Sequence, residues 1–161
     1  MSELRQPKHQ VAPRAKAMWA VDYGGSGVVA LIVVALLTYY DILNGIWPVA
    51  AGSAAALLVL LGFGVVPFWR YRVHRWEVTD TAVYTQRGWL VQERRIAPVS
   101  RVQTVDTERG PLAQIFGLST VTITTASAQG ELRIEGLLRA DADRLVSDLT
   151  VTTAAIPGDA T

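Results

Sequence analysis

The chain has 161 residues, 50% of them hydrophobic, and a formal net charge of +1 at pH 7. A charge so close to zero gives no support to nucleic-acid binding, which usually shows a strong basic excess. The sequence contains no cysteine, which excludes disulfides, zinc–thiolate sites and cysteine nucleophiles.

The first element is a polar segment over residues 1–22, which we expect to be a cytoplasmic tail too short to bury a core. A cleaved signal peptide is the rival interpretation of the apolar run that follows it. About 22 residues precede that run, Asp22 lies directly before it, and Tyr39-Tyr40-Asp41 offers no small-residue cleavage site. The pattern therefore favours a membrane helix over a signal peptide.

The next 47 residues, 23–69, carry a single charged side chain, that of Asp41. Two apolar runs predict transmembrane helices over about residues 24–43 and 46–68, because about 20 apolar residues span a hydrocarbon core of ~30 Å. Only a short bend separates the runs. The prediction is a helical hairpin with both ends on the same side of the membrane.

Charge and aromatic residues predict how this hairpin is oriented. Basic residues flank it on both outer sides, whereas the bend contains only Asp41, so both termini are expected in the cytoplasm. Aromatic side chains occupy the expected interfaces; these are Trp19, Tyr23, Tyr39, Tyr40, Trp47, Phe68, Trp69 and Tyr71. The chain is thus predicted to be a multi-pass protein of the cell membrane.

Inside the hairpin, small residues four apart, such as Gly52 and Ala56, let two helices approach closely. We favour packing of the second span against the first, and the alternative is an interface with a second copy or a partner. The glycine-rich start of the first span, Gly24-Gly25-Ser26-Gly27, follows no strand and precedes no Lys-Ser/Thr pair, which argues against a phosphate-binding loop. Neither span contains an ionisable residue, so anchoring is favoured over transport.

From Tyr71 onward the hydrophobic period changes to two, which predicts short β-strands. The final element has apolar residues at helical spacing, Ala142, Leu145, Val146 and Leu149, and predicts one amphipathic helix. Residues 153–161 are expected to be a flexible tail. The strands are expected over about residues 73–78, 82–87, 91–96, 101–107, 120–125 and 131–135, with a helical turn at 111–116.

Four segments resemble, in order and spacing, motifs of the bacterial pleckstrin-homology (PH) domains found in small membrane proteins. They are residues 69–79 (WRYRVHRWEVT), 84–88 (YTQRG), 96–105 (IAPVSRVQTV) and 116–123 (FGLSTVTI). Ala97 departs slightly from the family pattern. The similarity covers about residues 69–150, and the hairpin before it is typical of the family.

This resemblance implies a membrane protein with a two-helix hairpin followed by a PH-like α+β domain over residues 70–152. The domain would be a curled antiparallel sheet or barrel of about seven strands, capped by the C-terminal helix. A bacterial source is implied, and no activity is. The lysine-rich first loop of lipid-binding eukaryotic PH domains is not matched by Thr79-Asp80-Thr81-Ala82.

Residues with catalytic chemistry are sparse. Neither His9 nor His74 has a His or carboxylate at metal-ligand spacing, and His74 is expected to be a surface residue at the membrane interface. Paired carboxylates such as Asp106 and Glu108 can do acid–base work, but acidic residues near a turn are usually solvated. We therefore expect no enzyme, no metal and no cofactor.

Arginine supplies the candidate binding residues, since 13 of the 15 basic residues are Arg. Arg70, Arg72 and Arg75 are candidates for lipid headgroups, each attracted to anionic lipid by roughly 1 kcal/mol. Candidates for contact with a partner or the membrane are Trp89, Leu90, Arg94 and Arg95. The alternative for arginines on strands, such as Arg87, Arg94, Arg95 and Arg101, is ordinary ion pairing with Glu93 and Glu77.

The leading hypothesis is a non-enzymatic, membrane-anchored module that binds a protein partner, or another copy of itself, at the cytoplasmic surface. The alternative is a module that senses anionic lipid or membrane stress. A membrane enzyme or a transporter is the least favoured class, because the spans contain no ionisable residue and the chain contains no His–carboxylate motif.

Overall fold

The computed structural model describes residues 6–88, 91–126 and 130–155. The chain divides into two compact units. The first, Lys16–Arg70, is called the hairpin unit; the second joins Met1–Ala15 to Tyr71–Thr161 and is called the sheet domain. The sheet domain is therefore discontinuous in sequence, with the hairpin inserted into it.

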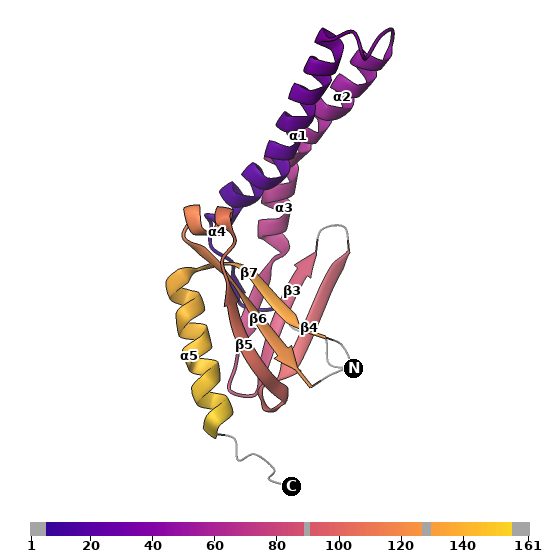
Figure 1. Ribbon diagram of the computed structural model, residues 1–161. Helices are drawn as coiled ribbons and strands as arrows, with labels where there is room; N and C mark the ends of the chain where they lie inside the picture. The colour runs from indigo at the N-terminus through magenta and orange to yellow at the C-terminus, as the bar shows by residue number, and fades with distance from the viewer. Residues whose placement is uncertain (1–5, 89–90, 127–129, 156–161) are drawn as a thin grey trace. The chain divides into compact units, whose positions relative to one another are not determined.

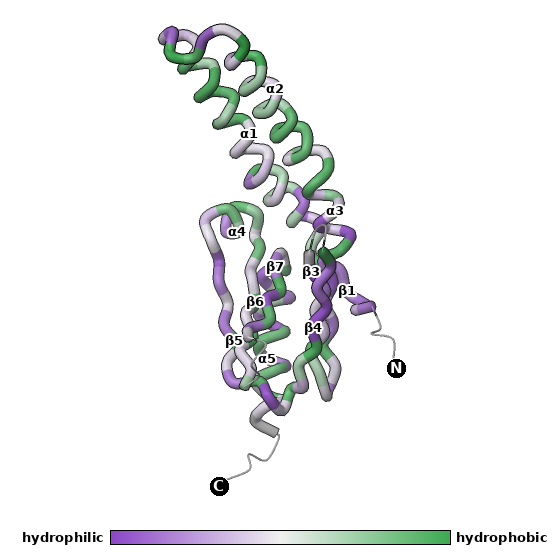
Figure 2. Tube along the Cα trace, turned by 90° about the vertical axis from the view of Figure 1, so that its right-hand side faces the viewer, coloured by the Kyte–Doolittle hydropathy of each residue, from purple (hydrophilic) through white to green (hydrophobic). Residues whose placement is uncertain are grey.

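Two long apolar helices form the hairpin unit (Figure 1). The first is α1, Ala15–Tyr39, and the second is continuous over Trp47–Val73, each long and apolar enough to cross a membrane. Hydrophobic residues dominate both helices (Figure 2), and large side chains such as Val29 and Leu58 are exposed along them, as a lipid environment requires. Both helices extend beyond the expected spans, α1 at its start and the second helix at its end.

The second helix is composed of α2 (Trp47–Leu60), a π-helical turn (Leu61–Val65) and α3 (Val66–Val73). This second helix contains Pro67. In a regular α-helix the ring of Pro67 would clash with the carbonyl of Phe63, four residues earlier. The wider π-turn ends at Val65, two residues before Pro67, and the helix continues past Pro67 to Val73.

Glycines mark the place where the two helices of the hairpin approach most closely. A Cβ atom added to Gly62 would lie 2.5 Å from the backbone nitrogen of Gly24, and one added to Gly27 would lie 2.7 Å from that of Val59. A Cβ added to Gly52 would meet no atom within 4 Å. The expected packing of Gly52 against the first span is therefore not observed, and its alternative, an interface with a partner, stays a prediction.

The small residues of α2 explain this difference. Residues 50–56 are Ala, Gly or Ser at every position, so their spacing does not indicate which face of the helix meets its neighbour. In the structure it is Ala55 that is buried, whereas Gly52 and Ala56 are half-exposed. The run that resembled a glycine-rich loop, residues 24–27, supplies the close contact instead.

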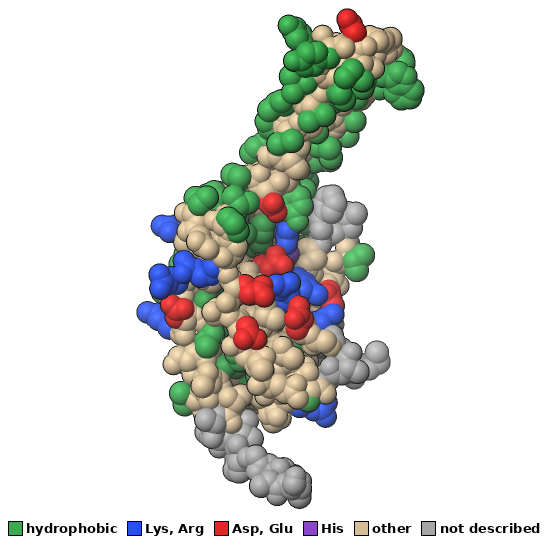
Figure 3. All heavy atoms as spheres, viewed as in Figure 1, with side chains coloured by type: hydrophobic (Ala, Val, Ile, Leu, Met, Phe, Trp, Pro, Cys, Tyr) green, Lys and Arg blue, Asp and Glu red, His purple; other side chains and the backbone are tan. Residues whose placement is uncertain are grey.

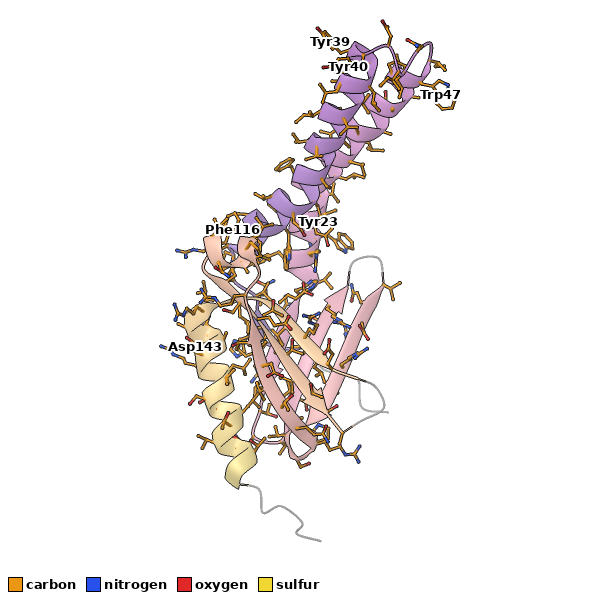
Figure 4. The ribbon with its side chains drawn as sticks, in the orientation of Figure 1. Tyr23, Tyr39, Tyr40, Trp47, Phe116 and Asp143 are labelled. Carbon is orange, nitrogen blue, oxygen red and sulfur yellow. The ribbon has the colours of Figure 1, made fainter. Side chains whose placement is uncertain are left out.

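Aromatic side chains surround the bend of the hairpin. Tyr39, Tyr40 and Trp47 lie there (Figure 4), and the rings of Tyr39 and Tyr40 meet edge to face with centroids 5.2 Å apart. The Nδ2 group of Asn44 donates a hydrogen bond of 2.7 Å to the carbonyl of Asp41, which has a positive φ of 56°. Such a left-handed residue reverses the chain, and Asp and Asn tolerate it better than most residues.

The sheet domain contains two antiparallel sheets and a C-terminal helix, which confirms the predicted fold class (Figure 1). One sheet has the order β1-β2-β3-β4 and the other has the order β5-β6-β7. The first sheet is formed by β1 (His9–Gln10), β2 (Arg75–Val78), β3 (Ala82–Gly88) and β4 (Gln92–Pro98). A 3₁₀ turn (Val99–Arg101) leads to β5 (Val102–Glu108), α4 (Pro111–Ile115), β6 (Leu118–Thr125), β7 (Leu132–Leu138) and α5 (Arg139–Ala155).

The N-terminal segment differs from the expected tail, because part of it belongs to the sheet domain. His9 and Gln10 pair antiparallel with Trp76 and Arg75 of β2. The next residue, Val11, is buried, and the backbone N–H of Ala12 donates a 2.8 Å hydrogen bond to Gly136 on β7. Two paired residues show no periodicity that a sequence pattern can detect, which is why this strand was not expected.

The core of the sheet domain lies between the two sheets and α5. Buried side chains of α5, Ala142, Leu145 and Leu149, pack against residues of β6 and β7, as the helical spacing predicted. Burying a Leu side chain stabilises a fold by about 1.5–3 kcal/mol. The remaining core residues are Val83, Ala97, Val99, Val121, Ile123, Leu132, Ile134 and Leu137.

Candidate functional site

A groove of about 690 Å³ runs between the edge of the first sheet and α5. We call it the α5 groove. On one side it is lined by β1, β2 and the turn after β2, including His9, Trp76 and Asp80. On the other side it is lined by one face of α5, from Asp141 to Thr152. The volume falls within the range of about 300–1,000 Å³ that is usual for ligand pockets.

The sheet side of the α5 groove offers an open strand edge. Strand β1 has only two residues and lies at the edge of its sheet, so half of β2, Glu77 and Val78, has no strand neighbour there among the described residues. Continued register would set Pro7 opposite Val78, and proline has no backbone N–H to pair. The ring of His9 lies 5.3 Å from that of Trp76, whose buried Nε1 has no hydrogen-bond partner among the described residues.

The lining of the groove is polar and carries excess negative charge. Asp141, Asp148 and Asp80 line the groove together with one basic residue of α5, Arg144. Val151, near the C-terminal end, exposes 67% of its surface there. An open strand edge beside a helix of this charge is chemically suited to an extended segment with basic side chains.

A separate charged cluster lies on β3 and β4. Glu93 accepts hydrogen bonds from Arg87 (2.9 Å) and Arg95 (2.5 Å), and Arg95 also donates to the carbonyl of Glu131 at 3.0 Å. These bonds, first from Arg87 and then from Arg95, hold the pKa of the Glu93 carboxyl below its usual value. For Arg87 and Arg95, the ion-pair alternative is therefore realised with Glu93. Glu77 pairs with Lys8 at 3.7 Å.

The other candidates for partner contact differ in how exposed their side chains are. Arg94 is exposed, whereas its neighbour Arg95 is half-buried, because successive side chains of a strand point to opposite faces. Arg95 also borders a smaller cavity of about 160 Å³ together with Arg101. Trp89 and Leu90 lie outside the described residues.

The three candidates for lipid headgroups occupy different environments. In the hairpin unit, the guanidinium of Arg70 donates to the hydroxyl of Tyr23 at 2.5 Å and lies 4.6 Å from the ring centre of Trp19. Arg72 is exposed on α3, whereas Arg75 is half-buried on β2. Arg72 is thus the most accessible of the three.

His74 is buried, with 6% of its surface exposed, so the prediction of an interfacial surface residue is wrong. It lies between the end of α3 and the start of β2, where the chain turns into the sheet domain. It lines a cavity of about 10 Å³ with Gln86, whose buried Oε1 has no hydrogen-bond partner among the described residues. A polar cavity of this size holds about one water molecule.

The acidic pair considered for acid–base chemistry makes contacts with other polar side chains. Asp106 accepts a hydrogen bond from Thr104 at 3.1 Å, and Glu108 pairs with Arg133 at 2.5 Å. Both carboxylates are exposed on β5. Within residues 6–88, 91–126 and 130–155, no three His, Asp or Glu side chains are grouped closely enough to hold a metal ion.

The apolar hairpin and the two antiparallel sheets with their C-terminal helix define a membrane-anchored protein with a PH-like domain. The family described as "Bacterial PH domain" matches residues 20–150. The chain is also 35% identical over 147 residues to "UPF0699 transmembrane protein YdbS" of Bacillus subtilis (strain 168), covering 87% of this chain and 89% of the relative. The chain belongs to the bacterial PH domain family, as the sequence motifs predicted.

The relative's name and the two apolar helices together support a location in the cell membrane. No solved structure gives a significant match to the chain. Sequence reasoning missed the α5 groove because one of its walls depends on β1. The residues before Val11, Gln-Pro-Lys-His-Gln, are polar and give no strand signal.

Proposed function

We propose that this protein is a non-enzymatic, membrane-anchored interaction module whose sheet domain binds an extended protein segment in the α5 groove. The segment would come from another membrane protein or from a second copy of the chain. The observation that carries the proposal is the open edge of β1 and β2 facing α5 across a groove of about 690 Å³.

Main-chain hydrogen bonds to the open edge would supply affinity, because an added strand satisfies backbone groups that otherwise face water. The carboxylates of Asp80, Asp141 and Asp148 would select basic side chains on that strand. Membrane anchoring favours the same binding, because confinement to one surface raises the effective concentration of two membrane-bound partners.

Photo-crosslinking in native membranes tests the proposal with the full-length chain. A photoreactive residue replaces Val151 or Asp80 inside the groove, and Gln103, exposed on β5, serves as the control position. We expect crosslinked bands from the groove positions alone, weakened when Asp141 and Asp148 are both changed to Lys. Equal crosslinking at Gln103, or no groove-dependent band, would contradict the proposal.

The proposed side of the membrane is the cytoplasmic one, for both termini and therefore for the sheet domain. Support comes from the basic residues outside the hairpin and the lone Asp41 in its bend. Because the native chain has no cysteine, a single Asn44→Cys variant reports on the bend. We expect labelling by an impermeant thiol reagent from outside intact spheroplasts, and no labelling there of a Gln10→Cys variant.

A second candidate function is the sensing of anionic lipid, which the exposure of Arg72 favours. Its headgroup contact would be worth roughly 1 kcal/mol and would weaken with salt. With photoreactive phosphatidylglycerol in nanodiscs, Arg72→Gln should reduce lipid crosslinking to the full chain. Unchanged crosslinking at low and high salt would remove this candidate.

A further inference from the structure

The short helix α4, between β5 and β6, presents an apolar surface to its surroundings. Ile115 exposes 77% of its surface, Pro111 is exposed, and Leu112 and Phe116 are half-exposed. Hydrophobic side chains gather over α4 in Figure 3, and Phe116 is labelled there in Figure 4. We call Pro111, Leu112, Ile115 and Phe116 the α4 tip.

The α4 tip is held by backbone hydrogen bonds. The N–H groups of Phe116 and Gly117 donate to the carbonyls of Leu112 and Gln114 at 3.1 and 3.2 Å. The side-chain amide of Gln114 donates to the carbonyl of Arg109 at 2.9 Å, so this polar group bonds back to the domain. The fold thus fixes an exposed apolar surface, and such a surface usually marks an interaction site.

Two arginines without a carboxylate partner among the described residues flank this tip. The guanidinium of Arg14 lies 3.6 Å from the point where a Cβ of Gly117 would be, and Arg109 lies two residues before Pro111, the first residue of α4. The buried Nε of Arg109 has no hydrogen-bond partner in the described part of the chain. Two nearby carboxylates are engaged elsewhere, Glu108 by Arg133 and Asp143 by Arg139.

The chain connects Arg14, beside the α4 tip, directly to the first transmembrane helix. Arg14 directly precedes Ala15, the first residue of the transmembrane helix α1. At 1.5 Å per residue, Tyr23, an exposed aromatic residue expected at the membrane interface, lies only about 12 Å further along the helix. A headgroup layer is about 5–7 Å deep on each side of the hydrocarbon core. The residue beside the α4 tip is thus tethered within reach of the headgroups.

We propose that the α4 tip contacts the bilayer that holds the hairpin, with Ile115 entering the boundary between headgroups and acyl chains. Arg14 and Arg109 bind lipid phosphates beside it. Apolar residues bordered by arginines are the composition by which peripheral elements bind a membrane surface. This lipid contact goes beyond the groove proposal and does not depend on it.

Single spin labels on the full-length chain test the proposal, since the native sequence has no cysteine. Ile115→Cys is compared with Ser147→Cys, an exposed position on α5, in nanodiscs of phosphatidylcholine and phosphatidylglycerol. We expect the Ile115 label to collide several-fold less with a water-soluble nickel chelate than the Ser147 label, and more with oxygen. Equal nickel access at both positions would overturn the proposal, and so would shielding from both reagents, which indicates contact with protein.

The role of the arginines is tested by adding Arg14→Gln and Arg109→Gln to the labelled Ile115→Cys chain. The expected result is a several-fold rise in nickel access at the Ile115 label, with an unchanged spectrum from the Ser147 label as evidence of an intact domain. If Arg14→Gln alone and the double variant both leave nickel access unchanged, the arginines do not hold the tip at the bilayer.

Discussion

The glycines of the hairpin allow a matched test of how its two helices pack. Gly62 and Gly64 lie in the same π-turn, and Gly25 and Gly27 lie two residues apart in α1. In the first pair only Gly62 lies close to the other helix, and in the second pair only Gly27 does. Changing each of the four to Ala adds the same methyl group, so any difference within a pair reports on interhelical packing alone.

The expected difference follows from the distances. An added Cβ would lie 2.5 Å from the nitrogen of Gly24 in the Gly62 variant and 2.7 Å from the nitrogen of Val59 in the Gly27 variant. Most real Cβ contacts lie beyond about 3.4 Å, so the helices must separate locally by about 1 Å. A gap of this size forfeits a quarter to a half of the attraction between each nearby pair of atoms, which is about 0.1–0.2 kcal/mol per pair. Overpacking of this kind costs about 1–3 kcal/mol.

The helical propensity of Ala exceeds that of Gly by roughly 1 kcal/mol, and this gain is common to all four variants. We therefore expect Gly62→Ala to be less stable than Gly64→Ala, and Gly27→Ala less stable than Gly25→Ala, by about 1–3 kcal/mol.

Spin labels on cysteines replacing the exposed Val29 and Leu58 report the separation of the helices in detergent micelles titrated with a denaturing detergent. The Gly62 and Gly27 variants should separate at lower denaturant than their controls. Equal midpoints within both pairs would refute the close-packing explanation.

Three further outcomes are expected. The hydrogen bonds from Arg87 and Arg95 lower the pKa of Glu93 in the folded protein. The ionised carboxylate therefore stabilises the fold at neutral pH, and this stabilisation is lost as pH falls from the unfolded-state pKa of about 4.3 through the lower folded-state pKa. Glu93→Gln should lower the free energy of unfolding of the sheet domain at pH 7 by no more than about 1 kcal/mol, and should lower it less at pH 3 than at pH 7. Val11→Asp places a carboxylate at a position where only 4% of the residue's surface is exposed, which destabilises the edge of the first sheet. Amide exchange in β2 should therefore become faster, whereas Pro13→Asp, at an exposed position, should leave it unchanged. Gly52→Leu should reduce chemical self-crosslinking in membranes if the open face of α2 is an interface between copies, while Gly64→Leu serves as the control.

The parts of the fold that could be predicted from sequence are those with a long or periodic signal. The hairpin follows from 47 residues with one charge, and α5 follows from Ala142, Leu145 and Leu149 recurring at helical spacing. The parts that could not be predicted depend on contacts between distant segments. The burial of His74 and the pairing of His9 with Trp76 are set by tertiary structure, because neither residue differs locally from an exposed one.

The candidate site was predictable only where it depends on local composition. Arginines beside carboxylates on neighbouring strands suggested ion pairs, and Arg87, Glu93 and Arg95 form them. The α5 groove required knowledge of which residues line the edge of β2. No sequence pattern provides that, since residues 9–10 and 75–78 are separated by the whole hairpin.

The pairing of β1 with β2 also constrains the membrane topology. Residues 9–10 precede the hairpin and residues 75–78 follow it, yet they belong to one sheet and must lie on one side of the bilayer. An odd number of crossings between them would separate the two strands, whereas a two-helix hairpin returns the chain to the side from which it began. The sheet domain is thus completed only by residues on both sides of the hairpin, and a fragment beginning after the second span would lack Val11, Ala12 and the hydrogen bond to Gly136. Insertion of the hairpin and closure of the domain are therefore coupled, because the same chain connections that anchor the domain also deliver its edge strand.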